Sequence, residues 1–207
     1  MQKIMFNDRF GLTEAVLKGT KTMTRRFIKQ LLNVENPDIS DWGLKDGGKA
    51  MITLYEGGRP MTDIFPMYQP GEVVAVAQRY CKVWKHPFTA EECLADEQEP
   101  EFLRYEKGWD NKMFIKPAYM PHRIEIANIK VERLQDISDE DSLKEGIFRD
   151  DIDQEFPFVF NIYGKHTACW RFSSPREAYA ALIDKMSGKG TWQSNPFVFV
   201  YTFKLIK

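Results

Sequence analysis

Segments rich in apolar, aromatic and β-branched residues recur along the chain, and apolar residues at helical spacing are confined to a few short stretches. At the start, the pattern predicts a strand at residues 3–6 and a helix that begins at residue 7 or 8 and ends at residue 18. Gly19 follows at the position where a helix commonly ends in a left-handed residue. The segment after Gly19 is therefore expected to be a loop that leaves the helix end.

Several strands are predicted in the middle of the chain. Residues 51–55 and 61–65 flank the turn sequence EGGRP, which predicts a hairpin with a glycine turn. Residues 73–84 have the apolar and aromatic content of a strand, and residues 113–115 predict a short strand that Pro117 ends.

The two longest predicted strands lie in the second half. Along residues 123–134 the buried parity changes between Ile126 and Ile129, so we expect a β-bulge near residues 127–128. Residues 197–206 are apolar on nearly every position, which predicts a central strand buried on both faces.

Two helices carry clear start signals. Ser138 precedes three acidic residues and predicts a short helix from residue 139 to 144 or 145, ended by Gly146. Ser174 with Pro175 and Glu177 combines a serine cap, a proline at the first helical position and an acid at the third. The residues that follow at helical spacing on the face assigned to this second helix are Ala178, Ala181, Leu182, Lys185 and Met186.

Strands outnumber helices, and no repeated strand-helix-strand unit is present. We therefore predict an α+β, strand-dominated fold, built as a small mixed or antiparallel β-barrel with peripheral helices. The 207 residues fit a single domain, with inserted loops near residues 34–66, 86–111 and 148–172.

Composition narrows the possible classes. No apolar run approaches the roughly 20 residues that span a bilayer, and the first residues lack a signal-peptide core, so we expect a cytoplasmic protein without membrane contact. The net charge of −1 argues against a protein that coats nucleic acid, so any nucleic-acid contact should be local. The three cysteines and three histidines lack metal-ligand spacing, so neither a metal nor another cofactor is expected.

One segment concentrates positive charge in this nearly neutral chain. Residues 18–29 contain five cations and no acid, together with three threonines. The five cations are Lys18, Lys21, Arg25, Arg26 and Lys29. One interpretation is that these cations do no more than complement the dipole at the C-terminus of the preceding helix. Five of them with three hydroxyls exceed that need, so the segment is a candidate anion-binding or catalytic loop.

Residues 19–26, with the sequence GTKTMTRR, resemble the G-x-K-T-x-T-x-R signature of the ASCH domain family, a relative of the PUA fold. The chain also resembles the phage and prophage branch of that family in four further pieces that occur in the family's order. These pieces are YQPGE at residues 68–72, MP at 120–121, VERLQDISDED with KEGI across 131–147, and GKGTWQSNP at 188–196. The resemblance implies a PUA-like β-barrel.

For function, the resemblance implies binding of RNA or a modified nucleoside in a cationic cleft beside the signature loop. An alternative is amide hydrolysis of an N4-acylated cytidine, as in a smaller relative, with catalytic residues that correspond here to Lys21, Thr24 and Glu145. Glu140 is a competing match for the glutamate. The residues expected to bind substrate or nucleic acid are Lys18, Thr22, Arg25, Arg26, Trp192 and Asn195.

These residue types suit amide hydrolysis. Thr24 can attack a carbonyl carbon if Lys21 is neutral, and neighbouring cations lower the pKa of a lysine. Glu145 acts in the opposite direction if it pairs with Lys21, and then holds a substrate amine or moves a proton. On this reading the three side chains line one solvent-reachable hollow beneath a positive rim.

Two other readings stay open. In a purely structural turn, Thr22 and Thr24 cap backbone groups while Lys21 pairs with Glu145. In a phage-type interaction module, the insertions at residues 43–66 and 87–108 dock a host protein.

The chain departs from the family pattern at one position, because Gln78 stands where this branch usually has an acid. If that acid helps to form the usual site, Gln78 cannot replace its charge or act as a base.

Overall fold

The computed structural model describes residues 1–32, 34, 37–45, 49–83, 105–150, 152–160 and 170–206. The fold is mixed α+β and rich in strands, which form several sheets with few helices. The described strands do not close into a barrel. The chain divides into two compact units, residues 1–6, 73–124 and 206–207 in unit 1 and residues 7–72 and 125–205 in unit 2. One domain with insertions stays a prediction.

Unit 1 is small and built around a parallel strand pair. Its elements are β1 (Lys3–Ile4), β6 (Val73–Val76), α2 (Tyr80–Val83) and two 3-10 helices, Lys112–Phe114 and Pro117–Tyr119. Lys3 pairs with Ala75 and Ile4 with Val76. The predicted strand at residues 73–84 ends at Val76, because α2 begins at Tyr80. The predicted strand at residues 113–115 is wrong, since Asn111 caps a 3-10 helix there.

Gly108 is required in unit 1 for a packing reason. A Cβ atom at Gly108 would collide with the Tyr80 ring. The Tyr80 ring is itself fully buried, and its hydroxyl accepts a hydrogen bond from the Lys116 backbone N–H at 2.7 Å. The Gly108 backbone therefore packs directly on this ring, at the edge of the segment 84–104 that lies outside the described residues.

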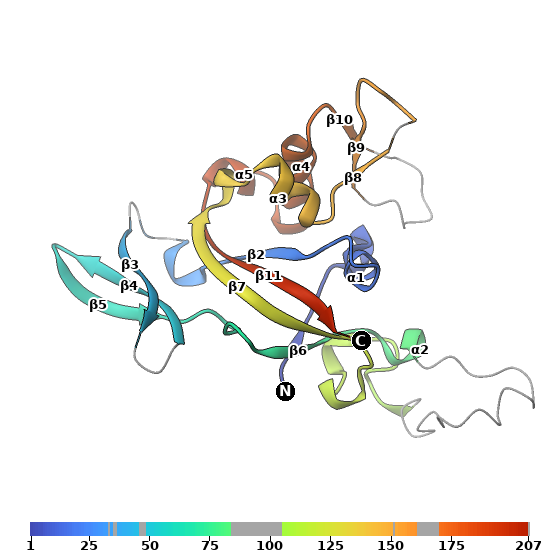
Figure 1. Cartoon of the computed structure of the whole chain (residues 1–207), viewed down its shortest axis with the longest axis horizontal. Coiled ribbons are helices and arrows are strands. Elements are labelled where there is room, and N and C mark those ends of the chain that lie inside the picture. Colours follow the sequence, from blue (N-terminus) through green and yellow to red (C-terminus); the bar gives the residue numbers. More distant parts are fainter. Residues whose placement is uncertain are drawn as a thin grey trace, which may run out of the picture. The chain divides into compact units, whose positions relative to one another are not determined.

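Unit 2 holds three groups of strands and most of the helices (Figure 1). Its strands are β2 (Met23–Phe27), β3 (Asp38–Lys45), β4 (Lys49–Glu56), β5 (Arg59–Ile64), β7 (Arg123–Arg133, which begins in unit 1), β8 (Phe148–Arg149), β9 (Phe158–Val159), β10 (Arg171–Phe172) and β11 (Phe197–Ile206). Its helices are α1 (Leu12–Leu17), α3 (Asp139–Lys144), α4 (Pro175–Ser187), α5 (Thr191–Ser194) and the 3-10 helices Asp8–Phe10, Lys29–Leu31 and Leu134–Asp136.

The sheet that carries the signature residues has β11 between β7 and β2. Strand β11 pairs antiparallel with β2, so that Tyr201 lies opposite Thr24 and Val200 opposite Arg25. Residues 198–201 are all buried, which confirms the prediction of burial on both faces for the first half of β11. At the other end Lys204 is exposed.

Strand β7 changes its buried parity where the sequence predicts it. Ile126 and Ile129 are buried, while Ala127 and Asn128 between them are both exposed. The strand continues without interruption across this point. The buried positions therefore change from even-numbered to odd-numbered residues within β7 itself.

The inserted segments form small sheets where the structure describes them. Residues 38–64 give the antiparallel sheet β3-β4-β5, and the predicted hairpin is confirmed with Gly57 and Gly58 both at positive φ. Strands β8, β9 and β10 form a second antiparallel sheet from the segment 148–172. The predicted insertion at residues 86–111 lies mostly outside the described residues.

The predicted helices are confirmed, with two corrections. Ser138 caps α3 by accepting from the Asp141 N–H, and Ser174 caps α4 by accepting from the Glu177 N–H. The first helix is divided at Gly11, whose φ of +66° ends the 3-10 helix before α1 begins. The buried face of α4 is also different, consisting of Pro175, Ala178, Tyr179, Leu182 and Ile183.

Candidate functional site

The signature segment begins as a turn and then becomes a strand. Gly19 has a φ of +74°, which confirms the left-handed residue expected after the helix. The Thr22 backbone N–H donates to the Lys144 carbonyl, and the Thr22 carbonyl accepts from the Phe203 N–H. Residues 23–27 form β2, so Thr24, Arg25 and Arg26 lie on a strand and not in the expected loop. This strand forms because it pairs with β11, a contact far away in sequence.

Lys21 and Glu145 form a direct buried ion pair. The Lys21 Nζ atom lies 2.6 Å from Glu145 Oε2, and it also donates to the Glu145 backbone carbonyl at 2.7 Å. The two side chains are 2% and 5% exposed. Glu145 is the C-cap residue of α3, and the positive φ of Gly146 directs the chain away immediately after it. The expectation that Lys21 and Glu145 lie together is therefore met.

Arg25 crosslinks three carboxylates beside this pair. Its Nη1 atom lies 3.1 Å from Glu145 Oε1, and its Nη2 atom lies 2.6 Å from Glu132 Oε1 and 3.4 Å from Asp141 Oδ2. The Arg25 side chain is 1% exposed. Although burial opposes it, Glu145 and Glu132 raise the pKa of Arg25, so the guanidinium stays charged. Arg25 is thus a buried anchor of the network and is not open to a phosphate.

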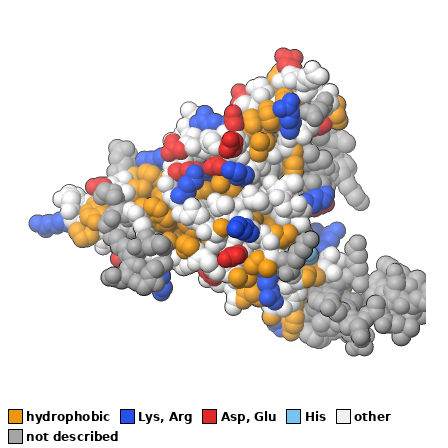
Figure 2. All heavy atoms as spheres, viewed as in Figure 1, with side chains coloured by type: hydrophobic (Ala, Val, Ile, Leu, Met, Phe, Trp, Pro, Cys, Tyr) orange, Lys and Arg blue, Asp and Glu red, His pale blue; other side chains and the backbone are white. Residues whose placement is uncertain are grey.

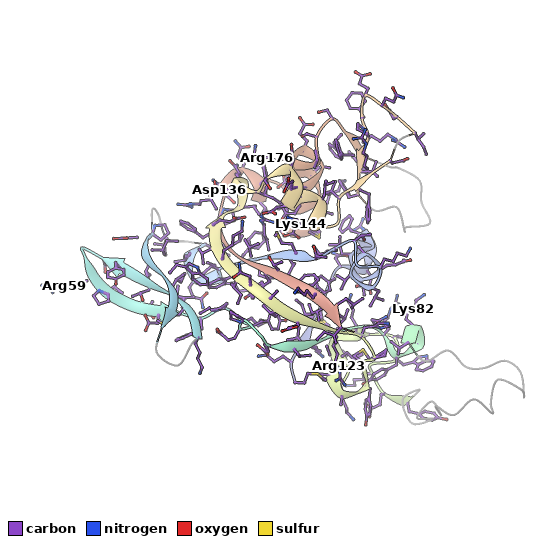
Figure 3. The ribbon with its side chains drawn as sticks, in the orientation of Figure 1. Arg59, Lys82, Arg123, Asp136, Lys144 and Arg176 are labelled. Atoms are coloured by element: carbon purple, nitrogen blue, oxygen red, sulfur yellow. The ribbon has the colours of Figure 1, made fainter. Side chains whose placement is uncertain are left out.

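The network becomes exposed at its other end. Lys130 Nζ lies 2.7 Å from Glu132 Oε2 and 3.4 Å from Asp141 Oδ2, and Lys144 Nζ lies 3.3 Å from Asp141 Oδ1. These two lysine side chains are about half exposed. Figure 3 shows Lys144 on α3 with Arg176 near the start of α4. A graded network therefore runs from the buried pair of Lys21 and Glu145 to surface lysines.

Burial and charge tune the titration of the network. Burial lowers the pKa of Lys21, Glu145 opposes this effect, and Arg26 and Arg25 add to it. Partial burial of Asp141 favours its neutral form, but Lys144, Lys130 and Arg25 outweigh this and hold its pKa below the ordinary value. The site thus combines a lysine that loses its proton more readily than usual with a carboxylate at hydrogen-bond distance.

Thr24 lies elsewhere. Met23 Sδ contacts Arg25 Nη1 at 3.4 Å, so these alternate residues share one face of β2. Thr24 and Arg26 therefore lie on the opposite face. Lys21, Thr24 and Glu145 thus do not line one open hollow: the lysine and the glutamate bury one another, while Thr24 is 5% exposed on the other face.

The other predicted site residues also differ from expectation. Lys18 is half exposed and pairs with Glu14 at 2.9 Å, outside the buried network. Lys21, Arg25, Lys130 and Lys144 each face a carboxylate, so these four described cations do not form the expected positive rim. Figure 2 shows acidic and basic side chains interspersed over the visible described surface.

Trp192 and Asn195 mainly support the fold. Arg176 lies 5.3 Å over the Trp192 ring, and the ring meets Tyr179 edge-on at 6.2 Å. Asn195 adopts a φ of +44°, and its carboxamide oxygen accepts from the Gln135 N–H at 2.8 Å. Arg176 thus lies over the Trp192 ring that was expected to bind substrate, and Asn195 holds the turn after α5.

Three residues of the site were missed by sequence reasoning. Glu132 and Asp141 lie inside the segment that carries the resemblance, but they look like ordinary surface acids in a strand and a first helical turn. Tyr179 was omitted from the apolar face of α4, although it follows the buried Ala178 directly. The excess of cations at residues 18–29 was the available signal, because buried cations require nearby carboxylates.

Gln78, the departure from the family pattern, lies in unit 1. Its side-chain oxygen is 2.8 Å from His122 Nδ1.

Within the described residues, no group of three or more His, Cys, Asp or Glu side chains is arranged to hold a metal ion. None of the helices among the described residues is long and apolar enough to cross a bilayer.

Comparison with protein-family models, with curated proteins and with solved structures finds no match to this chain. The features that bear on function are therefore the geometry of the Lys21, Arg25 and Glu145 network and the sequence resemblance.

Proposed function

We propose that this chain is a PUA-like protein of the ASCH type that binds a pyrimidine nucleoside, free or within RNA, at the network around Lys21 and Glu145. The PUA-like assignment draws on the signature at residues 19–26 and on the strand-rich α+β fold. We place the protein in the cytoplasm, as expected from its composition.

The observation that carries the proposal is the 2.6 Å contact between Lys21 Nζ and Glu145 Oε2 in a buried setting. Buried ionisable pairs cost desolvation energy, and replacing them with apolar residues is often neutral or stabilising. Perturbed groups of this kind concentrate at functional sites. Glu145 can accept from an exocyclic amine, while Lys21 can donate to a ring nitrogen or carbonyl.

Charge balance favours a nucleoside over the RNA backbone as the main determinant of binding. Lys21, Arg25, Lys130 and Lys144 face the carboxylates of Glu132, Asp141 and Glu145. Of these four cations, Lys130 and Lys144 are about half exposed and can also neutralise a phosphate, so the network itself releases few counterions on binding.

Calorimetric titration of cytidine and of a short cytidine-rich RNA at two salt concentrations tests this proposal. We expect cytidine to bind with little dependence on salt, and the RNA to add a slope of at most about two phosphate contacts. Absence of cytidine binding, or RNA binding with the steep slope of many phosphate contacts, contradicts the proposal.

Hydrolysis of an N4-acylated cytidine is the second candidate, and the lowered pKa of Lys21 favours it. A lysine that releases its proton more readily can serve as a general base toward a water or a hydroxyl. Incubation with N4-acetylcytidine, followed by chromatography for cytidine, measures this activity. The reaction should be lost in Lys21→Met. Equal turnover in Thr24→Ala removes the predicted threonine nucleophile but leaves a water-dependent reaction.

A third candidate, docking of a host protein, has one supporting observation in the described residues. The hairpin strand β5 exposes Met61, 60% accessible, and Phe65 just beyond it is 52% accessible. Their substitution by serine should abolish such docking without changing nucleoside binding.

A further inference from the structure

Tyr179 contributes a buried hydroxyl that has no hydrogen-bond partner. The residue lies on α4 and is 1% exposed. Within the described part of the chain, its hydroxyl is the one buried side-chain polar atom without a partner. Native proteins satisfy nearly all such groups, because a buried donor without an acceptor is costly. Such a hydroxyl is a position where an ordered water or a ligand supplies the missing acceptor.

The hydroxyl belongs to the same network as the proposed site. Arg25 Cζ lies 5.9 Å from the centre of the Tyr179 ring. Glu145, Glu132 and Arg25 all act electrostatically on the hydroxyl. The polar atoms of Arg25 and Glu145 are already engaged in ion pairs at 2.6 to 3.1 Å. Tyr179 thus supplies an unused donor next to groups that satisfy one another.

The chemistry of these neighbours limits the ligand. Burial, Glu145 and Glu132 raise the pKa of the Tyr179 hydroxyl well above its ordinary value, so the phenol stays protonated and donates. A neutral acceptor such as a carbonyl oxygen suits this donor. Each carboxylate oxygen of Glu145 can accept a second hydrogen bond beside its ion pair, so Glu145 also suits an amine or amide N–H of the same ligand. An edge that presents a carbonyl acceptor beside an N–H donor is found in the pyrimidine bases cytosine and uracil, and in amides.

We propose that the Tyr179 hydroxyl determines specificity in this site by donating a hydrogen bond to a carbonyl oxygen of a neutral pyrimidine nucleoside. This assignment depends on the proposed function. It adds that the recognised group is the uncharged base, so a 5′-phosphate contributes little.

The test compares Tyr179→Phe with a matched control, Tyr201→Phe. The Tyr201 hydroxyl accepts a hydrogen bond from the Met67 N–H at 3.0 Å, so its role is structural. We expect Tyr179→Phe to keep or raise the melting temperature, because it removes an unsatisfied group. The control should lower the melting temperature by about 2–4 °C, as expected for loss of one hydrogen bond in a chain of this size.

Calorimetry with cytidine, cytidine 5′-monophosphate and uridine supplies the binding data. We expect cytidine to bind at least about tenfold more weakly to Tyr179→Phe, and its affinity for Tyr201→Phe to stay unchanged. Cytidine and its monophosphate should bind the wild-type protein within about threefold of one another.

The outcomes separate the two proposals. If the wild-type protein binds cytidine and Tyr179→Phe binds it equally well, the assignment of Tyr179 is wrong while the nucleoside site stands. A lower melting temperature in Tyr179→Phe also overturns the assignment, because the hydroxyl then has a structural partner. If the wild-type protein binds none of the three probes, the proposed function fails, and the assignment fails with it.

Discussion

At the scale of single residues, the proposed site depends most on the buried ion pair of Lys21 and Glu145. Removing one partner from a buried pair leaves an uncompensated charge, which commonly costs about 3–5 kcal/mol. We therefore expect Glu145→Gln to lower the free energy of unfolding by that amount, measured by urea denaturation.

The matched control is Lys18→Met, which removes a lysine of the same segment from its exposed pair with Glu14. Exposed pairs contribute at most about 1 kcal/mol, so this variant should unfold almost as the wild-type protein does. Similar losses in the two variants would show that the buried pair contributes no more than a surface pair.

Tyr201 gives a prediction for alkaline pH. Burial raises the pKa of its hydroxyl to about 12, above the ordinary value of 10.0. Between these two values the folded protein holds a proton that the unfolded chain releases, so stability falls as pH rises. A shift of this size corresponds to about 2–3 kcal/mol. Lowering of the Lys21 pKa acts in the opposite direction, since stability then rises with pH toward 10.5.

Comparison with Tyr201→Phe isolates the tyrosine contribution. Urea denaturation at pH 9 and pH 11 should show a smaller loss of stability in the variant than in the wild-type protein. Equal losses would mean that Tyr201 titrates at its ordinary pKa in the folded state.

At the scale of elements, the turn after α3 determines where Glu145 lies. Gly146 has a φ of +100°, and a Cβ atom there would lie 3.1 Å from Leu12 Cδ2 and 3.6 Å from Lys21 Cδ. Gly188 after α4 also has a positive φ, of +109°, but nothing lies within 4 Å of its Cβ position. Alanine at either position strains the backbone, and only at Gly146 does it also press on the side chains around Lys21.

We expect Gly146→Ala to lower stability by about 1 kcal/mol more than Gly188→Ala, as measured by thermal denaturation. It should also weaken cytidine binding. Equal costs for the two substitutions would show that the packing of Gly146 against Leu12 and Lys21 is not tight.

The elements also show what sequence patterns can and cannot predict. The caps Ser138 and Ser174 and the glycine turn at residues 57–58 act through neighbours in sequence, and they were predicted correctly. Residues 23–27 form β2 because they pair with β11. A contact so far away in sequence cannot be predicted from the local pattern. For the same reason, the meeting of Lys21 with Glu145 came from motif order, and the contacts of Arg25 with Glu132 and Asp141 were not foreseen.

At the scale of the whole molecule, the last strand completes the core. Strand β11 lies between β7 and β2 and contributes the buried residues Val198, Phe199, Val200, Tyr201 and Phe203. Each large apolar side chain stabilises the fold by about 1.5–3 kcal/mol on burial, so the loss of five of them is comparable to the whole stability of an ordinary domain. A chain truncated after Asn195 should not fold, as judged by circular dichroism. A soluble truncated protein with a cooperative melting transition would contradict this view of the core.

The most direct measurement of the central claim is the side-chain ¹⁵N–¹H spectrum of protein labelled at its lysines, recorded during a titration with cytidine. The Lys21 ammonium signal is identified by its loss in Lys21→Met. We expect cytidine to shift the Lys21 signal more than that of Lys116, whose ion pair with Glu106 lies at the surface of unit 1. A Lys21 signal that stays unchanged at saturating cytidine would contradict a nucleoside site at Lys21 and Glu145.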